Sequence, residues 1–274
     1  GAALAPENTI RAVQRAQEPS IEAEIVEVDL HATADGELVV VHDATVDRVT
    51  GAGLGCATAQ DTAEGTFGEL RVSALTLQEL GALDAGACFV DEAGGHPFAG
   101  QGVTIPTLTE LLTTFPGQRF MLEVKQTEPS LVPDLVALVE ALGAVERTCY
   151  LAFDEGATQE LAALVSDEGC IAMPSSGVRC YATDGVFPFG GGGCPAYDVL
   201  WAPRASSGLN LATPRVVGNA HAAGMPAFYW TINDEPTMSD VLAAGADGVV
   251  TDRPDLLRAL LDSQAPPPTN QETP

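Results

Sequence analysis

Short apolar runs alternate with longer stretches of mixed character along most of the chain. The runs have the length and side-chain types of β-strands, and the stretches between them have those of helices. Strands that alternate with helices predict βαβ units and a parallel sheet. The expected strands are residues 25–31, 119–125, 148–154, 169–175, 197–203, 227–233 and 247–252, and the expected helices are residues 6–17, 129–142, 155–167, 213–224 and 235–246.

The order of these elements predicts an α/β fold of the (β/α)₈ TIM-barrel type. Seven strands follow one another, and the helical stretch that opens the chain has no strand before it, so the first strand is expected upstream of Gly1. Residues 1–262 are expected to form the barrel. Residues 44–106 interrupt the alternation and are predicted to be a small glycine-rich insertion after the second strand and its hairpin. Residues 263–274 are predicted to be a disordered proline-rich tail.

A hairpin is predicted near the start, because a second strand-like run, residues 37–43, follows the first expected strand after only a few residues. Such a short connection cannot make a parallel crossover, so the two strands must be antiparallel. The dipeptide Asp35-Gly36 favours a two-residue turn. A turn centred there places Asp29 directly opposite His42, with Cβ atoms about 5 Å apart.

Acidic side chains gather on two of the expected strands. Side chains alternate along a strand, so Glu27, Asp29 and His31 share one face of the first strand, and Glu123 and Lys125 share one face of the next. Three carboxylates brought together would repel one another without a cation, and their oxygens favour Mg²⁺ or Ca²⁺ over zinc or copper. We therefore predict that Glu27, Asp29 and Glu123 bind Mg²⁺ or Ca²⁺. The alternative is that they pair with arginines in a polar barrel mouth.

The charge balance of the chain restricts its partners. With 38 acidic and 12 basic residues, the formal net charge is −26 at pH 7, which disfavours nucleic acid and anionic membranes. No apolar run approaches the ~18 residues of a membrane span. An anionic substrate would need a local positive charge. Lys125, the only lysine, is the candidate, because it lies at a strand end beside the expected metal ligands.

The four histidines differ in their expected settings. His42 should face a metal ligand at a strand end, which favours a role as general acid or base. His31 is expected at the rim of the same site. His96, in the insertion, and His221, in a helix, are expected to be structural or solvated.

The six cysteines contain no CxxC pair and no zinc-type spacing with histidine, which argues against a thiolate metal site. Cys149 and Cys170 lie in apolar runs and are expected to be unpaired buried thiols. Cys180 and Cys194 flank a glycine-rich loop, and a disulfide between them is predicted. Such a bridge favours the periplasm or the exterior of the cell, and the cytoplasm is the alternative.

Several short motifs follow one another along the chain. In order they are Gly1, Ala5-Pro6-Glu7-Asn8-Thr9, Glu27-x-Asp29, Thr33-x-Asp35-Gly36, Val40-Val41-His42-Asp43, Ile105-Pro106-Thr107-Leu108, Leu122-Glu123-Val124-Lys125, Trp230-Thr231-Ile232-Asn233 and Asp247-Gly248-Val249-Val250-Thr251-Asp252-Arg253-Pro254. This set resembles the glycerophosphodiester phosphodiesterase family over nearly the whole chain, to about residue 260. Each match alone is weak, but the ordered set is specific.

The resemblance implies a metal-dependent barrel hydrolase that cleaves glycerophosphodiesters, as small-molecule substrates, to sn-glycerol 3-phosphate and an alcohol. It implies that Glu27, Asp29 and Glu123 are the metal ligands. It also implies that His42 is one of two acid/base histidines and that Lys125 contacts the phosphate.

Three further features follow from the same resemblance. Trp230 resembles the family's aromatic residue at the site, where it would pack on the glycerol carbons, although a place in the core is the alternative. Residues 44–106 resemble an extra segment near the barrel mouth that would wall the glycerol end of the substrate. The family begins with His-Arg-Gly, and Gly1 resembles that glycine, so the other histidine and a phosphate-contacting arginine are expected upstream.

Two other functions stay open. One is a barrel phospholipase of the sphingomyelinase D type, which the long insertion and the absence of a basic membrane-docking surface disfavour. The other is a protein that binds glycerophosphodiesters through the metal cage without turning them over. Release of glycerol 3-phosphate from glycerophosphocholine, with and without metal, separates the three.

Overall fold

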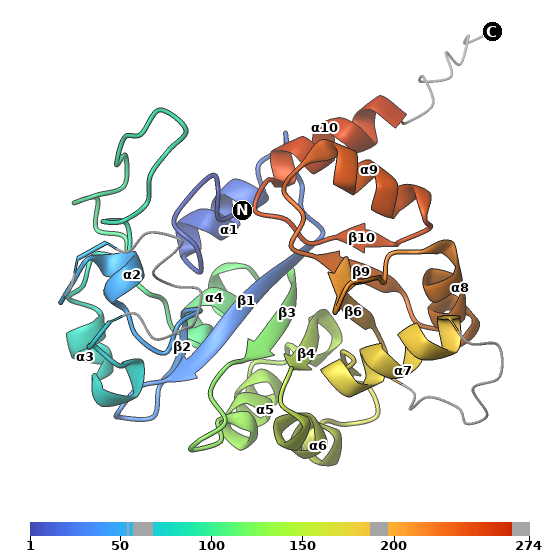
Figure 1. Cartoon of the computed structure of the whole chain (residues 1–274). Helices are drawn as coiled ribbons and strands as arrows, with labels where there is room; N and C mark the ends of the chain where they lie inside the picture. Colours follow the sequence, from blue (N-terminus) through green and yellow to red (C-terminus); the bar gives the residue numbers. More distant parts are fainter. Residues whose placement is uncertain (54, 57–67, 187–196, 265–274) are drawn as a thin grey trace, which may run out of the picture.

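The computed structural model describes residues 1–53, 55–56, 68–186 and 197–264 (Figure 1). Each of the expected parallel strands forms at its expected place, although several are shorter than the apolar run that predicted them. The parallel strands are β1 (Ile25–Ala32), β3 (Arg119–Val124), β4 (Thr148–Ala152), β5 (Cys170–Ile171), β6 (Leu200–Pro203), β9 (Ala227–Trp230) and β10 (Gly248–Val249). Three short strands pair antiparallel, namely β2 (Leu38–Val40), β7 (Ala205–Ser206) and β8 (Leu209–Asn210).

The parallel strands lie side by side in chain order. One sheet has the order β2-β1-β3-β4-β5, and a second has the order β10-β9-β6. A parallel bridge between Ala172 and Val199 joins the two sheets. Helices surround this array on the outside (Figure 1). The fold is therefore the α/β barrel of TIM type that the alternation of strands and helices predicted. Within the described residues, no ladder joins β10 back to β1.

Five helices confirm the expected ones, and most begin at a side chain that caps the first turn. Thr9, Asp154, Thr213 and Asp234 each accept a hydrogen bond from the backbone N–H three residues later, which fixes where the helix starts. The confirmed helices are α1 (Ile10–Ala16), α5 (Val132–Ala141), α6 (Glu155–Leu164), α8 (Pro214–Ala222) and α9 (Glu235–Ala243).

Three further helices of the barrel were not predicted from the sequence, namely α4 (Leu108–Thr114), α7 (Ser175–Val186) and α10 (Pro254–Gln264). The expectation of a loop from residue 181 is wrong up to Val186, because α7 continues through these residues despite two glycines. The rest of that loop, and the expected tail beyond Gln264, lie outside the described residues. None of the helices described combines the length and apolar character needed to cross a bilayer.

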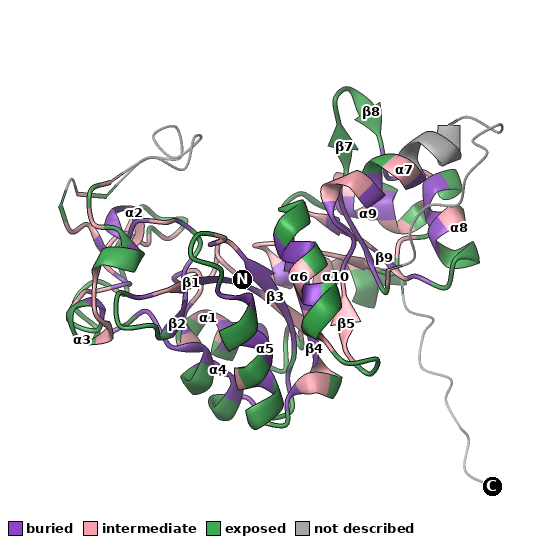
Figure 2. Ribbon diagram, turned by 90° about the horizontal axis from the view of Figure 1, so that it is seen from below, coloured by how far each residue is buried: buried purple, intermediate pink, exposed green. Residues whose placement is uncertain are grey.

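The barrel has an apolar core inside and larger ones outside. Inside, Met121, Leu151, Ala172, Val199 and Trp201 are buried together. Outside, one cluster packs β1, β3 and β4 against α1, α4, α5 and α6, and a second packs β6 and β9 against α7, α8 and α9. Figure 2 shows the buried strands between helices whose outer faces are exposed. This packing holds the strands firmly, and the carboxyl ends of β1 and β3 project into a cleft.

The β1–β2 hairpin forms, but its register differs from the expected one by one residue. Leu30 faces Val40, and the N–H of Val41 donates to the carbonyl of Asp29 at 2.9 Å. Asp29 therefore lies opposite Val41, not His42. The reason is Gly36, which adopts φ +85°, a backbone conformation in which L side chains are strained. With Gly36 in this conformation, the loop contains three residues instead of two.

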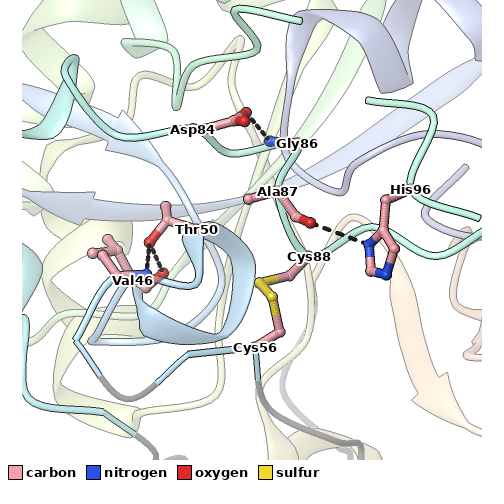
Figure 3. Close-up of a disulfide and its surroundings, with 9 residues drawn as sticks. Val46, Thr50, Cys56, Asp84, Gly86, Ala87, Cys88 and His96 are labelled. Atoms are coloured by element: carbon pink, nitrogen blue, oxygen red, sulfur yellow. Dashed lines mark hydrogen bonds between the residues drawn. A yellow bond between two sulfur atoms is a disulfide. The ribbon is translucent and has the colours of Figure 1, made fainter. Parts of the chain in front are cut away.

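The described residues of the insertion, 44–53, 55–56 and 68–106, pack beside this hairpin around a small core that they share with it. They include α2 (Asp47–Thr50), the 3₁₀ turn η1 (Val72–Ala74) and α3 (Leu77–Leu80). Their core comprises Val39, Val41, Val46, Val72, Leu80, Ala85, Val103 and Ile105. A disulfide between Cys56 and Cys88, which the sequence did not predict, ties the segment together next to the helical turn α2 (Figure 3).

A second disulfide corrects the expectation for Cys149 and Cys170. These residues are not unpaired thiols but form a disulfide, because they face each other directly across the parallel strands β4 and β5. The two strands could be predicted, but the register that makes the sulfurs meet could not. Cys194 lies outside the described residues, and so does the predicted bridge from Cys180 to Cys194.

Candidate active site

Three carboxylates meet at the carboxyl ends of β1 and β3. The two strands are parallel and in register, with Asp29 beside Glu123 and Glu27 beside Met121. Glu27, Asp29 and Glu123 each offer an oxygen, and the three atoms lie within 4.8 Å of one another. We call these three residues the carboxylate cage. The sequence predicted this grouping, since side-chain alternation and a parallel pair of strands leave few other arrangements.

The electrostatics of the carboxylate cage fit a cation. Burial, together with the charges of Asp29 and Glu123, raises the pKa of Glu27 well above its usual value. Burial also raises the pKa of Glu123, although Lys125 opposes this shift. Oε1 of Glu27 is buried and has no hydrogen-bond partner among the described residues. A buried oxygen without a donor is costly unless a cation or a proton satisfies it, and hard oxygen ligands suit Mg²⁺ or Ca²⁺.

Lys125 lies directly beside the carboxylate cage. Its Nζ is 2.6 Å from Oε1 of Glu123 and 3.1 Å from Oδ1 of Asp29. Burial lowers the pKa of the ammonium, but the attraction of the two carboxylates outweighs it, and the pKa of Lys125 is raised. The lysine is therefore charged and faces the cleft. Among the described residues, the ion pairs of the carboxylate cage are the two with Lys125.

Asn8 fixes Asp29 through two hydrogen bonds, and this role of Asn8 was not predicted from the sequence. Its Nδ2 donates to Oδ2 of Asp29 at 2.8 Å, and its Oδ1 accepts from the N–H of Asp29 at 3.2 Å. The backbone of Asn8 adopts φ +55°, a left-handed conformation that asparagine tolerates better than most residues. The signal in the sequence is the motif Pro6-Glu7-Asn8-Thr9, in which nothing local indicates a contact with Asp29.

His42 reaches the cleft from the residue after Val41. Its side chain is half exposed, and its Nδ1 lies 2.7 Å from Oδ1 of Asp43. This hydrogen bond raises the pKa of His42 against the opposing effect of burial, and Asp29 contributes in the same direction. The structure therefore brings His42 near the carboxylate cage, although not by the cross-strand pairing expected.

The other histidines have supporting or peripheral places. His31 is buried, its Nε2 lies 3.2 Å from the carbonyl oxygen of His42, and burial lowers its pKa. His96 contacts the carbonyl of Ala87 in the insertion (Figure 3), and His221 pairs with Asp247 at 2.8 Å. Neither His96 nor His221 lines the cleft.

A cleft of about 690 Å³ contains these groups at one end and continues along β1 to Arg119 and to α10. The carboxylate cage, His42, Lys125 and Trp230 line it. The Trp230 ring packs against Phe153, with ring centroids 5.4 Å apart, so Trp230 belongs both to the wall of the cleft and to the interior core. At the carboxyl ends of β1 and β3, the cleft therefore combines acidic ligands, the ammonium of Lys125, the imidazole of His42 and an aromatic wall.

Comparison with known proteins agrees with this chemistry. The model of the glycerophosphoryl diester phosphodiesterase family matches residues 1–162 and 192–256. The chain is thus a phosphoric diester hydrolase by class. It belongs to the glycerophosphoryl diester phosphodiesterase family, and its activity is the hydrolysis of glycerophosphodiesters.

Individual relatives extend over nearly the full length of the chain. A glycerophosphodiester phosphodiesterase of Caldanaerobacter subterraneus subsp. tengcongensis is 27% identical over 92% of this chain and 90% of its own length. The crystal structure of the Agrobacterium tumefaciens enzyme is 25% identical, with a TM-score of 0.69 over 93% of this chain and 94% of its own. An Oleispira antarctica phosphodiesterase in complex with the product sn-glycerol-3-phosphate has a TM-score of 0.66 at 24% identity, covering 94% and 92% of the two chains.

Proposed function

We propose that the chain hydrolyses glycerophosphodiesters at the cleft described above, with Mg²⁺ or Ca²⁺ held by Glu27, Asp29 and Glu123. One observation carries the proposal: three carboxylate oxygens lie within 4.8 Å of one another, and a buried oxygen of Glu27 lacks a partner among the described residues. When bound, the cation would polarise a phosphoryl oxygen and offset charge in the transition state.

Lys125 has a second role in this proposal. The lysine now acts as counter-ion to Asp29 and Glu123. Once the carboxylate cage is filled, those carboxylates need no ammonium, and the positive charge of Lys125 can bind a phosphate oxygen in the cleft. An ammonium that stabilises charge in the transition state accelerates the reaction more than one that binds only the substrate.

His42 and Trp230 supply the remaining interactions. The imidazole of His42 accepts or donates a proton at the reacting oxygens, and Trp230 offers an apolar wall for the glycerol carbons. The products are sn-glycerol 3-phosphate and an alcohol.

Residues 1–262 act as one barrel domain in this proposal, with residues 44–106 at its mouth. Two contacts support that position. Arg48, in the insertion, bonds to Asp43 beside His42, and Glu92 lies 2.7 Å from Arg253, which follows β10. The two disulfides in the described part of the chain favour an extracytoplasmic location, since the cytoplasm keeps thiols reduced.

Release of sn-glycerol 3-phosphate from glycerophosphocholine tests the proposal. We expect release that stops after chelation and returns with Mg²⁺ or Ca²⁺. Substrate binding without release would favour the non-enzymatic alternative, and cleavage of sphingomyelin in preference to glycerophosphocholine would favour the sphingomyelinase D alternative.

Two matched variants locate the reaction. Glu123→Gln removes one charge from the carboxylate cage and should abolish metal-stimulated release, because the amide is a weaker ligand. Glu168→Gln makes the same chemical change at an exposed position and should leave release unchanged. Equal activity in the two variants would contradict the assigned site.

A further inference from the structure

A chain of ion pairs leads from His42 to the loop that opens the protein. Oδ2 of Asp43 accepts a hydrogen bond from Nε of Arg48 at 2.5 Å. The two terminal nitrogens of Arg48 donate to the two carboxylate oxygens of Glu7, at 2.7 and 2.5 Å. All three nitrogens of one guanidinium are thus engaged by two carboxylates. Bidentate pairing of this kind fixes geometry more tightly than a single contact.

These ion pairs determine which nitrogen of His42 carries the proton. Burial opposes ionisation of Asp43, but hydrogen bonds from His42 and Arg48 outweigh it and lower the pKa of Asp43 to about 2. An ionised carboxylate can only accept hydrogen bonds, so Nδ1 of His42 must be the donor. In the neutral imidazole, Nε2 then holds the lone pair and is the atom that can take up a proton.

The ion pairs that link Asp43, Arg48 and Glu7 are shielded enough from solvent to act as a rigid support. The side chain of Asp43 is 9% exposed and that of Arg48 is 20% exposed. Ion pairs on an open surface contribute little, because solvent screens them. Removing one partner of a buried pair instead leaves its counterpart charged and unsatisfied. Loss of Arg48 would therefore release both Asp43 and Glu7.

The same loop also supports the carboxylate cage. Glu7 binds Arg48, and the next residue, Asn8, binds both the backbone N–H and the carboxylate of Asp29. The loop is closed by Thr9, whose hydroxyl donates to the carbonyl of Pro6 at 2.6 Å. Adjacent residues of one short loop thus hold the histidine on one side and a cage carboxylate on the other.

We infer that Arg48 is a positioning residue, which holds Asp43 against Nδ1 of His42 and ties the imidazole, through Glu7, to the loop that also fixes Asp29. Arg48 contacts neither the cleft nor the reacting groups. It sets where Nε2 lies relative to the carboxylate cage. The inference rests on the proposed function, in which His42 transfers a proton.

Arg48→Ala tests this role through the separation of kcat from KM. We expect kcat to fall roughly 10²-fold, as for a displaced catalytic group. The KM and the affinity for Mg²⁺ should stay within about twofold of the parent, because Arg48 touches neither ligand. Added guanidinium at millimolar concentration should restore part of kcat by occupying the space between Asp43 and Glu7.

Arg147→Ala is the matched control. Arg147 donates to the backbone carbonyls of Leu112, Phe115 and Gln118, away from the cleft. Its loss should lower the free energy of unfolding but leave kcat unchanged and insensitive to guanidinium. A purely structural Arg48 would give the same pattern as Arg147, and that result would overturn the inference.

Glu7→Gln and a spectroscopic measurement keep the test open if Arg48→Ala does not fold. Glu7→Gln should lower kcat to a value between those of the parent and Arg48→Ala, and an unchanged kcat would contradict the inference. Nitrogen chemical shifts of the His42 ring at pH 8 should show Nδ1–H alone in the parent and a mixture of tautomers in Glu7→Gln. A single tautomer in both proteins would overturn the inference. The tautomer does not depend on turnover, so a parent that fails to hydrolyse glycerophosphocholine would contradict the proposed function without deciding the role of Arg48.

Discussion

At the residue scale, Lys125 is shared between the carboxylate cage and the substrate. Its ammonium lies 2.6 Å from Glu123 and 3.1 Å from Asp29, so it competes with a metal ion for the same oxygens. The carboxylates in turn raise the pKa of Lys125, which keeps the charge in place against burial. One side chain therefore opposes metal binding and favours the binding of phosphate.

Lys125→Met should separate these two effects, because methionine keeps most of the apolar stem and removes the charge. At pH 8 we expect the affinity for Mg²⁺ or Ca²⁺ to rise roughly fivefold or more, since the competing cation is gone. Transition-state stabilisation should fall by on the order of 2 to 4 kcal/mol. Calorimetric metal titration and steady-state kinetics measure the two quantities.

Arg15→Met provides the control for this variant, because Arg15 pairs with Glu18 on the half-exposed surface of α1. It should change neither quantity. Weaker metal binding in Lys125→Met, or turnover equal to that of the parent, would contradict the account of this lysine.

The members of the carboxylate cage could be found from the sequence, and the residues that support them could not. Alternation along two parallel strands suffices to gather Glu27, Asp29 and Glu123 on one side. Asn8 and Arg48 act through tertiary contacts instead. The bond from Arg48 to Glu7, for example, spans 41 residues. The local pattern of hydrophobic and polar residues does not indicate a contact between residues so far apart in the sequence.

At the element scale, a buried carboxylate inside the insertion holds two of its segments together. Oδ1 of Asp47 accepts from the N–H of Glu69, and Oδ2 accepts from the N–H of Leu70. Gly53 and Gly68 lie so close that a Cβ at either position would be 2.3 Å from a carboxylate oxygen of Asp47. Glycine is required there because two chain segments converge on one side chain.

Asp47→Ala should therefore loosen the insertion. The N–H groups of Glu69 and Leu70 would lose a fully buried carboxylate as their acceptor, at a cost of about 2 to 4 kcal/mol. Urea unfolding should record this loss, and hydrogen exchange should accelerate first at the amides of residues 69–72. Asp167→Ala, at an exposed position, is the control. Equal stability of the two variants would show that Asp47 does not anchor the segment.

Secondary structure was predictable where the apolar pattern was strong and less so where a single glycine decided the geometry. The parallel strands and five helices lie where the pattern placed them. The hairpin register was missed by one residue because Gly36 lengthens the loop. Helix α7 was missed because its glycines and serines resemble a loop, although Val178 and Tyr181 pack into the core. In that helix, the burial of apolar side chains outweighs the low helix propensity of glycine and serine.

At the scale of the whole molecule, the net charge of −26 opposes the approach of an anionic substrate. Charges of the same sign slow association, and salt screens them over about 8 to 10 Å at physiological ionic strength. The chain has 12 basic residues, and at the cleft Lys125 and the proposed cation must offset this field locally.

Added monovalent salt should therefore accelerate the enzyme on an anionic diester. Between about 20 and about 200 mM KCl, at saturating metal, we expect kcat/KM for glycerophosphoglycerol to rise about two- to fivefold. Glycerophosphocholine carries no net charge and should respond much less. A fall in kcat/KM with salt for both substrates would mean that a positive patch, rather than the overall negative field, governs association.

The central claim is that Glu27, Asp29 and Glu123 form the cation site on which hydrolysis depends. The most direct test is a calorimetric titration of Mg²⁺ or Ca²⁺ into the metal-free protein, in parallel with Glu123→Gln and Glu168→Gln. The account predicts one saturable site in the parent and in Glu168→Gln, with binding lost or weakened at least about tenfold in Glu123→Gln. Identical binding isotherms for all three proteins would place the cation elsewhere and contradict the assignment of the carboxylate cage.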